Sequence, residues 1–374
     1  MIFIEKTKCL FAHAREILYL RFLKFVCRMR HRTPIFRTLR SLILVIGLTL
    51  LPQLNHAQYV PDILGNDYWQ RTFHMGQDDE GEVVSTLVKR SFDEQTKTAV
   101  LYLHGYNDYF FQKELGDSIA AWGYRFYALD LRKYGRSLRP HQDAFYCESL
   151  REYFADIDTA LTTIRQEGAE AILLMGHSTG GLISTYYLQT RQASTGVRAL
   201  ILNSPFLDWN FGWFMEEVML PTVAYIGKWF PRLPVSGEDV PNYAFSLLYD
   251  HQGEWTFLTN WKMPYGHTKR AGWIRAIQEA QQSVQNGKRL QCPVLVLSSD
   301  HSLREESQWK EDYLRADIVL DVKDIRRYGE PLSPTTTYHA IPDGMHDLVL
   351  SNRTARQQTY RVLHDWMTQL SLFE

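Results

Sequence analysis

Short apolar runs alternate along the chain with segments of helical periodicity. The apolar runs have the length and the β-branched composition of buried strands, and they lie at residues 99–103, 124–130, 171–175, 199–203 and 293–297. Over 150–166, apolar side chains recur every three or four positions, as on one face of a helix. This alternation predicts an α/β fold with a mainly parallel sheet covered by helices on both faces. Residues 83–91 and the region around 69–73 are expected to supply leading antiparallel strands, and 337–341 a last strand.

The interval between residues 203 and 293 interrupts this alternation. It is too long for one crossover, and it holds six of the ten Trp residues together with ten Phe and Tyr residues. We expect residues 205–290 to form a helical, aromatic-rich cap inserted into a core of 58–204 and 291–374. The aromatic side chains are expected to pack together and also to line an apolar pocket beside the strand ends.

The N-terminal part of the chain, 1–57, differs from the rest in charge. It carries ten basic and two acidic side chains and ends in an apolar run at 42–51, which is the pattern of a secretory signal peptide. That run is shorter than the roughly 20 residues that span a bilayer. We therefore expect cleavage before Gln58 and export, periplasmic or secreted, with no stable membrane span. Because the basic part before the run is unusually long for a signal peptide, Met29 is the expected true start. The alternative is an uncleaved N-terminal anchor with an amphipathic helix over 10–27.

The remainder of the chain, 58–374, carries 31 basic and 40 acidic side chains, so the expected mature protein is acidic. An acidic balance argues against a nucleic-acid partner. Apolar residues at 45% and charged residues at 22% exclude an intrinsically disordered chain. Four Cys cannot form a disulfide framework, and a bond between Cys147 and Cys292 is possible but not predicted. No CxxC or HExxH spacing indicates a metal site, and no cofactor is expected.

The strongest chemical motif is Gly176-His177-Ser178-Thr179-Gly180. It follows a buried strand and precedes a helical segment, as in the G-x-S-x-G nucleophile elbow. Ser178 would lie in a strained turn, so small residues are needed at Gly176 and Gly180. The turn would expose the Ser178 hydroxyl at a helix N-terminus, where unpaired N–H groups favour developing negative charge.

An acyl-transfer site also needs two backbone donors for the oxyanion. One is expected from Thr179, which follows the nucleophile, and the other from the loop after the strand at 99–103. The N–H of Tyr106 is the candidate in that loop. Asn107 and Asp108 are instead expected to cap a helix over 109–121.

The general base is expected near the C-terminus, because it follows the nucleophile and the acid in this kind of site. His346 lies in the loop after the strand at 337–341 and is the candidate. His339 lies within that strand and is expected to be structural. The remaining histidines in motif loops are expected to shape those loops: His104, His177 and His301.

Three residues are candidates for the acid that orients the base. Asp300 directly follows a predicted strand, and Asp317 opens an apolar segment beyond an insertion at 301–315. Asp321 is the third candidate, although it could equally cap the following helix. The carboxylate must reach Nδ1 of the histidine.

These motifs together resemble the α/β-hydrolase superfamily, and within it the monoacylglycerol lipase and serine aminopeptidase-like group. The resemblance covers about 65–372 outside the cap, and it includes a structural Asp-Arg-x-x-Gly-like turn at 130–137. In this group the acid usually opens an Asp-x-Val-Val-like segment at a characteristic distance before the histidine. Asp317 matches that pattern best in both its segment and its distance from His346, whereas Asp300 lies farther away along the chain.

The resemblance implies a serine hydrolase that cleaves carboxylic esters through Ser178, His346 and Asp317. The expected substrate is a small apolar ester held by the cap. An aminopeptidase shares the same constellation and would need cap carboxylates for the substrate ammonium. A hydrolase-like scaffold that binds a ligand without catalysis is the other alternative.

Overall fold

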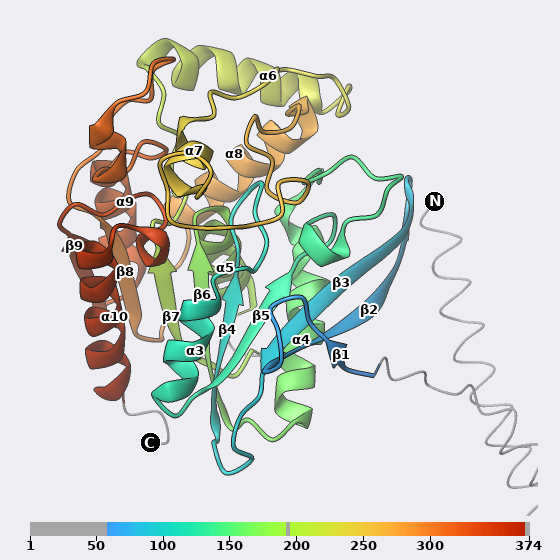
Figure 1. Cartoon of the computed structure of the whole chain (residues 1–374). Coiled ribbons are helices and arrows are strands. Elements are labelled where there is room, and N and C mark those ends of the chain that lie inside the picture. Colours follow the sequence, from blue (N-terminus) through green and yellow to red (C-terminus); the bar gives the residue numbers. More distant parts are fainter. Residues whose placement is uncertain (1–57, 192–194, 371–374) are drawn as a thin grey trace, which may run out of the picture. The chain divides into compact units, whose positions relative to one another are not determined.

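The computed structural model describes residues 58–191 and 195–370. These residues contain a nine-stranded sheet in the order β1-β2-β3-β5-β4-β6-β7-β8-β9 (Figure 1). The pairs β1–β2, β2–β3 and β3–β5 are antiparallel. From β5 onward in this order, each strand runs parallel to the next. The strands are β1 (Val60–Pro61), β2 (Tyr68–Asp78), β3 (Gly81–Arg90), β4 (Thr98–Leu103), β5 (Arg125–Asp130), β6 (Ala171–His177), β7 (Val197–Asn203), β8 (Val294–Ser299) and β9 (Thr336–Ile341).

Helices cover both faces of the sheet, as the alternating pattern predicts. One hydrophobic core joins the sheet to α4, α5, α8 and α9, and a second joins its other face to α3 and α10. The helices are α3 (Lys113–Ala121), α4 (Phe154–Gln166), α5 (Thr179–Arg191), α6 (Leu220–Gly227), α7 (Asn242–Leu247), α8 (Ala271–Gln285), α9 (Val322–Gly329) and α10 (Arg353–Thr368). The short helices are η1 (Gly135–Ser137), η2 (Leu150–Tyr153), η4 (Met215–Met219), η5 (Glu311–Leu314), η6 (Glu330–Leu332) and η7 (Leu348–Leu350), of which η4 is a π-helix.

The continuous apolar runs are explained by these two cores. Neighbouring residues of a strand point to opposite faces of the sheet. In β4, Leu101 and Leu103 enter the core beside α4 and α5, while Val100 and Tyr102 enter the core beside α3 and α10. A strand that is buried on both faces therefore needs apolar residues at every position. The predicted mainly parallel α/β fold with leading antiparallel strands is confirmed.

The predicted start of the helix at 109 is wrong. The helix α3 begins at Lys113, and its N-cap residue is Gln112 rather than Asn107 or Asp108. Residues 109–111 are aromatic side chains that are almost fully buried, and their backbone is not helical. Asn107 and Asp108 bind a distant part of the chain, as described below.

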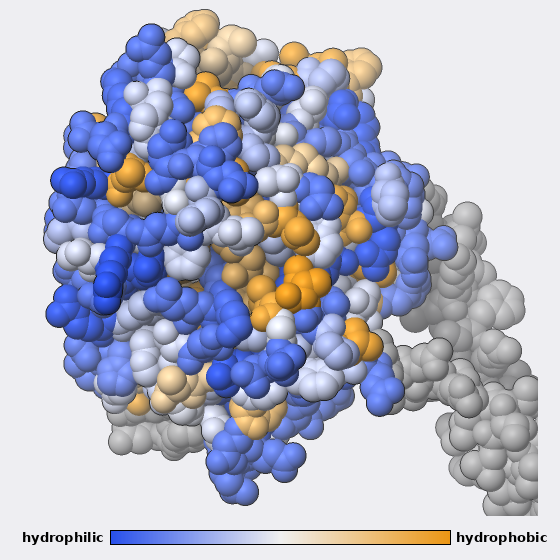
Figure 2. All heavy atoms as spheres, viewed as in Figure 1, coloured by the Kyte–Doolittle hydropathy of each residue, from blue (hydrophilic) through white to orange (hydrophobic). Residues whose placement is uncertain are grey.

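The segment between β7 and β8 contains η4, α6, α7 and α8. The helix α8 packs against both α5 and α6, so the last part of the segment belongs to the helical layer that covers the sheet. The aromatic residues of the segment divide into two groups. Trp273 and Phe257 are buried, whereas exposed aromatic side chains follow one another around η4 and α6. They include Phe211, Trp213, Phe214, Tyr225, Trp229 and Phe230, and Figure 2 shows hydrophobic residues at the top of the view, over α6.

The predicted signal peptide, the start at Met29 and the alternative anchor all lie in residues 1–57, outside the described residues. Within the ranges 58–191 and 195–370, no helix is long and apolar enough to cross a membrane. Cys147 is buried, Cys292 is half-buried, and both thiols are free.

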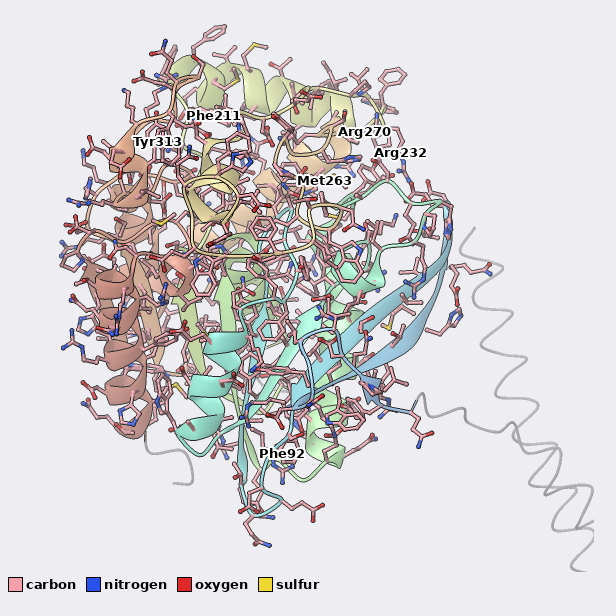
Figure 3. All side chains as sticks on the ribbon, in the orientation of Figure 1. Phe92, Phe211, Arg232, Met263, Arg270 and Tyr313 are labelled. Carbon is pink, nitrogen blue, oxygen red and sulfur yellow. The ribbon has the colours of Figure 1, made fainter. Side chains whose placement is uncertain are left out.

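Ion pairs connect the inserted segment to the β2–β3 hairpin and the loop before α4. Arg232 binds Glu80 at 2.9 Å, and the carboxylate of Asp143 accepts from Arg270 at 2.8 Å and from His267 at 2.7 Å. Although burial opposes it, hydrogen bonding to His267 and Arg270 lowers the pKa of Asp143. Arg232 and Arg270 lie close together in Figure 3. The pairs attach two separate stretches of the inserted segment, around Arg232 and around Arg270, to neighbouring parts of the core.

A buried arginine holds the turn at 130–137 in place. The Arg136 guanidinium binds Asp62 through Nε at 2.6 Å and Nη2 at 2.8 Å, and it binds Asp130 through Nη1 at 2.9 Å. Both carboxylates are fully buried. Gly135 adopts φ 46°, and a Cβ there would lie 2.5 Å from Oδ2 of Asp130, so this position requires glycine. The turn has the structural role that the resemblance implies.

We predict that Arg136→Met lowers the free energy of unfolding by about 3–5 kcal/mol, because it leaves two buried carboxylates without a cation. Urea denaturation followed by circular dichroism measures the change. Arg326→Met is the matched control, since Arg326 pairs with Glu330 on the surface, and it should cost less than about 1 kcal/mol. Equal losses in the two variants would contradict the assigned role of Arg136.

Candidate active site

Ser178 lies in a strained turn between β6 and α5. Its φ is 51°, a left-handed conformation that is uncommon for a residue with a side chain. A Cβ at Gly176 would lie 2.5 Å from the carbonyl oxygen of Gly180, and a Cβ at Gly180 would lie 2.4 Å from that of His104. Backbone atoms cannot move away as side chains do, so both positions need glycine. The turn has the geometry that the G-x-S-x-G spacing predicts.

The loop after β4 lies directly beside the serine. A Cβ at Gly105 would be 3.1 Å from the Cβ of Ser178. Among the described residues, no acceptor is found for the backbone N–H of Tyr106 or that of Thr179. Thr179 is also the first residue of α5, where the helix dipole favours negative charge. The two predicted oxyanion donors are therefore available on either side of the nucleophile.

His346 is held by Asp317. The Nδ1 of His346 lies 2.9 Å from Oδ2 of Asp317, and both side chains are buried. A carboxylate can only accept, so Nδ1 carries the proton and Nε2 is left as the basic nitrogen. The other oxygen of Asp317 accepts the N–H groups of Val319 and Leu320, both at 2.8 Å. The acid is thereby fixed in one orientation toward the histidine.

The insertion after β8 explains how Asp317 reaches the histidine. The Asp317 N–H donates to the carbonyl of His301 at 3.1 Å, and its own carbonyl accepts the N–H of Leu303 at 3.0 Å. The chain therefore returns to the end of β8 after the excursion. Asp300 is 41% exposed and accepts from His301 and from the N–H of Asp343. Asp321 caps α9 through the N–H of Lys323.

Two residues that the sequence analysis did not single out connect the serine turn to the histidine loop. Asn203, the last residue of β7, accepts the Ser178 N–H through its carbonyl at 3.0 Å. Its side chain donates to Asp347 at 2.7 Å and accepts the N–H of Leu348 at 3.3 Å. Asp347 is buried and also accepts from Gln112 at 3.2 Å. The feature of the sequence that could have pointed to Asn203 is a polar side chain at the end of an otherwise apolar strand.

Two rings flank the imidazole of His346. The His177 ring lies 4.9 Å away between centroids, and the half-buried Tyr243 ring from α7 meets it edge-on at 5.4 Å. Burial lowers the pKa of His177, so this histidine stays neutral, and its Nδ1 donates to the carbonyl of Asn203 at 3.2 Å. A neutral neighbour leaves His346 free to accept a proton without repulsion from a second cation.

His104 has the shaping role expected of it. Its Nε2 accepts the N–H of Leu131 at 3.1 Å, so Nδ1 is protonated and donates to the carbonyl of Gly105 at 2.8 Å. His339 lies exposed on β9, and His301 pairs with Asp300. In the described part of the chain, no cluster of three or more His, Cys, Asp or Glu residues could hold a metal ion.

Glu305, in the loop between β8 and η5, is a half-buried carboxyl that binds the start of α7. It accepts the N–H of Tyr243 at 3.2 Å. Burial raises the pKa of Glu305 to about 7, with a smaller contribution from Asp239. A raised pKa in the folded state means that the folded protein holds this proton more tightly than the unfolded chain does. Ionisation of Glu305 therefore destabilises the fold as the pH rises from about 4.5 to about 7.

We predict that Glu305→Gln raises the melting temperature above pH 7 and that this gain disappears below about pH 5. Glutamine keeps an acceptor for the Tyr243 N–H but cannot ionise, so the difference between variant and wild type isolates this carboxyl. Differential scanning fluorimetry from pH 4.5 to 8 measures it. Glu94→Gln, on the exposed surface, is the control and should parallel the wild type. A gain that is constant with pH would rule out the titration of Glu305.

Comparisons with known proteins agree with this geometry. The family described as serine aminopeptidase, S33, matches residues 94–350. A soluble variant of monoglyceride lipase from Saccharomyces cerevisiae has a similar structure, with a TM-score of 0.59 at 15% identity, over 83% of this chain and 99% of that one. The monoacylglycerol lipase of Paleococcus ferrophilus has a TM-score of 0.52 at 18% identity, over 81% and 98%.

A comparison with curated proteins finds no match. The structural matches, at such low identity, establish the fold, and the family match spans more than half of the chain, including the elbow, Asp317 and His346. The chain belongs to the serine aminopeptidase S33 family of the α/β-hydrolase superfamily.

Proposed function

We propose that this protein is a serine hydrolase that cleaves carboxylic esters. The observation that carries the proposal is the buried pair of His346 and Asp317 at the same end of the sheet as the strained Ser178 turn. A positioned acid, a base with a free Nε2 and a strained nucleophile turn are the parts of a Ser-His-Asp triad. Family membership and the lipase-like fold support the same reaction class.

The proposed acylation step follows from this arrangement. Nε2 of His346 takes the proton of Ser178 as the serine oxygen attacks the ester carbonyl. The carbonyl oxygen becomes an oxyanion, which accepts the N–H groups of Tyr106 and Thr179. Asp317 stabilises the imidazolium through Nδ1. When the tetrahedral intermediate collapses, the alcohol leaves with the proton of His346, and an acyl-serine remains.

Deacylation uses the same groups, with water in the place of the departed alcohol. His346 removes a proton from water, and the resulting hydroxide equivalent attacks the acyl-serine carbonyl. The two backbone donors hold the second oxyanion. The intermediate then releases the carboxylic acid and returns the proton to the oxygen of Ser178. No net proton is lost by the enzyme over the two steps.

The aromatic character of the inserted segment supports an apolar acyl or alcohol group. Tyr106 of the loop beside the serine packs against Trp273 of α8 at 4.5 Å and against Phe145 at 5.4 Å between ring centroids. On the other side, Tyr243 of α7 contacts His346. Apolar and aromatic walls around a few polar groups are typical of sites for small organic ligands.

The family name also suggests an aminopeptidase, which needs a free carboxylate for the substrate ammonium. Three carboxylates of the inserted segment already have partners, and three others, Glu217, Glu238 and Asp250, lie exposed on the surface. Asp239 pairs with Lys269, Glu254 with Arg356, and Glu216 accepts the N–H of Phe211 at 2.6 Å. We therefore favour the ester substrate, and a direct comparison of the two substrate classes decides between them.

We predict that the protein cleaves p-nitrophenyl esters faster than aminoacyl p-nitroanilides and that a fluorophosphonate probe labels Ser178. Ser178→Ala should abolish both, because the serine oxygen is the atom that forms the acyl-enzyme. Absorbance at the nitrophenolate or nitroaniline band and mass spectrometry of the labelled peptide are the measurements.

Ser307→Ala, in an exposed loop, is the control and should keep full labelling. Faster cleavage of the anilides would support the aminopeptidase. A folded protein that neither reacts with the probe nor cleaves either substrate would instead support a binding scaffold.

We predict that Asp317→Asn lowers kcat by about 10⁴-fold, because an amide cannot hold the imidazole in the same tautomer or stabilise its charged form. Asp300→Asn is the matched control at the other candidate position, and it should change kcat by less than about 3-fold, since Asp300 faces solvent. Steady-state kinetics with one p-nitrophenyl ester compares them. Full turnover in Asp317→Asn together with loss in Asp300→Asn would reverse the assignment.

A further inference from the structure

Three consecutive residues of the loop after β4 bind one short stretch of the inserted segment. Asn107 donates to the carbonyl of Met263 at 2.8 Å and accepts its N–H at 2.7 Å. Asp108 pairs with Lys262 at 3.0 Å, and the hydroxyl of Tyr109 accepts the N–H of Leu258 at 2.8 Å. Met263 lies in the upper part of the view in Figure 3, below α6. We call residues 258–263 the positioning segment.

The pair of Lys262 and Asp108 is buried on both sides, at 6% and 1% exposed. A buried charge is costly unless it is paired, so the ammonium and the carboxylate constrain each other strongly. Aromatic rings surround the ammonium, with the centroid of Tyr243 at 5.6 Å and those of Phe111 and Phe257 at 5.9 Å. Tyr243 also contacts His346. Lys262 therefore lies between two parts of the site: it pairs with Asp108 in the loop after β4, and its ammonium is near the Tyr243 ring that meets His346.

Asn107 stands next to the proposed oxyanion donor and has an unusual backbone. Its φ is 49°, a left-handed conformation that asparagine tolerates better than most residues. The two bonds to Met263 hold the side chain at both its oxygen and its nitrogen. Asn107 follows Tyr106 directly, so its anchored side chain and fixed backbone hold the chain on the C-terminal side of Tyr106.

We propose that the positioning segment sets the position of the Tyr106 N–H, with Asn107 and Lys262 as positioning residues; this inference rests on the proposed function. An oxyanion donor acts only when it is aimed at the place where charge develops in the transition state. The bonds from Met263 and Lys262 hold the loop at Asn107 and Asp108, while at Gly105 the loop runs so close to Ser178 that a Cβ would lie 3.1 Å from that of the serine. The inserted segment would then contribute to the rate as well as to substrate binding.

The test uses two variants that remove the contacts; Lys262→Met leaves the buried Asp108 unpaired, and a double variant below removes that charge as well. Asn107→Gly removes both bonds to Met263 and keeps a residue that adopts positive φ freely. Lys262→Met removes the charge and keeps the length of the side chain. The control is Lys133→Met, because Lys133 is also a buried lysine paired with carboxylates, Asp78 and Glu80, but not with the oxyanion loop.

We expect Asn107→Gly and Lys262→Met to lower kcat for a p-nitrophenyl ester by about 10- to 100-fold, up to the loss seen when an oxyanion donor is removed. KM should change less than about 3-fold. The inhibition constant of a boronic acid, which mimics the tetrahedral intermediate, should rise in parallel with the loss in kcat/KM. Lys133→Met should lower the melting temperature and leave kcat and the inhibition constant unchanged.

A double variant separates positioning from stability. In Asp108→Asn/Lys262→Met both charges are gone, so the melting temperature should return toward that of the wild type. A positioning role predicts that kcat stays low in this stable protein, since the ion pair between the positioning segment and the loop after β4 is still missing. Recovery of kcat together with the melting temperature would overturn the proposal.

Hydrogen–deuterium exchange of a peptide covering residues 104–109 gives a readout that needs no turnover. Exchange should be faster in Asn107→Gly and Lys262→Met than in the wild type. Unchanged exchange would overturn the proposal even in a protein without esterase activity, and faster exchange with unchanged kcat in an active enzyme would overturn it too. Absence of Ser178-dependent hydrolysis in the wild type would instead reject the proposed function.

Discussion

The site depends on how closely the backbone packs at the Ser178 turn. A Cβ at Gly180 would lie 2.4 Å from the carbonyl oxygens of Leu103 and His104, at the end of β4. The start of α5 and the loop after β4 are therefore in direct contact, and this contact brings the nucleophile and both proposed oxyanion donors together. Asn203 adds the histidine loop to the same centre.

The parts of this structure that were predicted from the sequence are those that local pattern determines. Buried strands need apolar residues at every position, and the serine turn needs glycines on both sides, so each leaves a signature in one short stretch of chain. Asn107 and Asp108 show the opposite case. A short polar pair before a helical segment is typical of a cap, but their partners lie 156 and 154 positions away in the chain. Asn203, Tyr243 and Asp347 were not singled out for the same reason.

Asp317 shows how an insertion makes the acid of the site hard to find from the sequence. From the sequence alone, Asp300 at the end of a strand was as reasonable as Asp317, and only the resemblance separated them. In the structure, backbone hydrogen bonds between residues 301–303 and Asp317 close the insertion. The excursion between them therefore changes the spacing along the chain without changing where the carboxylate lies. Distance along the chain from the preceding strand is therefore a poor guide to the acid when the ends of such a loop are hydrogen-bonded to each other, whereas the distance from Asp317 to His346 remained a useful guide.

The uneven burial of tryptophan has an optical consequence. Trp213 and Trp229 are 72% and 66% exposed beside α6, whereas Trp273 and Trp366 lie within the two cores at 5% and 9%. Indole emission shifts to longer wavelength in water, so Trp213 and Trp229 should emit at longer wavelength than Trp273 and Trp366. A soluble quencher should reach the first pair and spare the second.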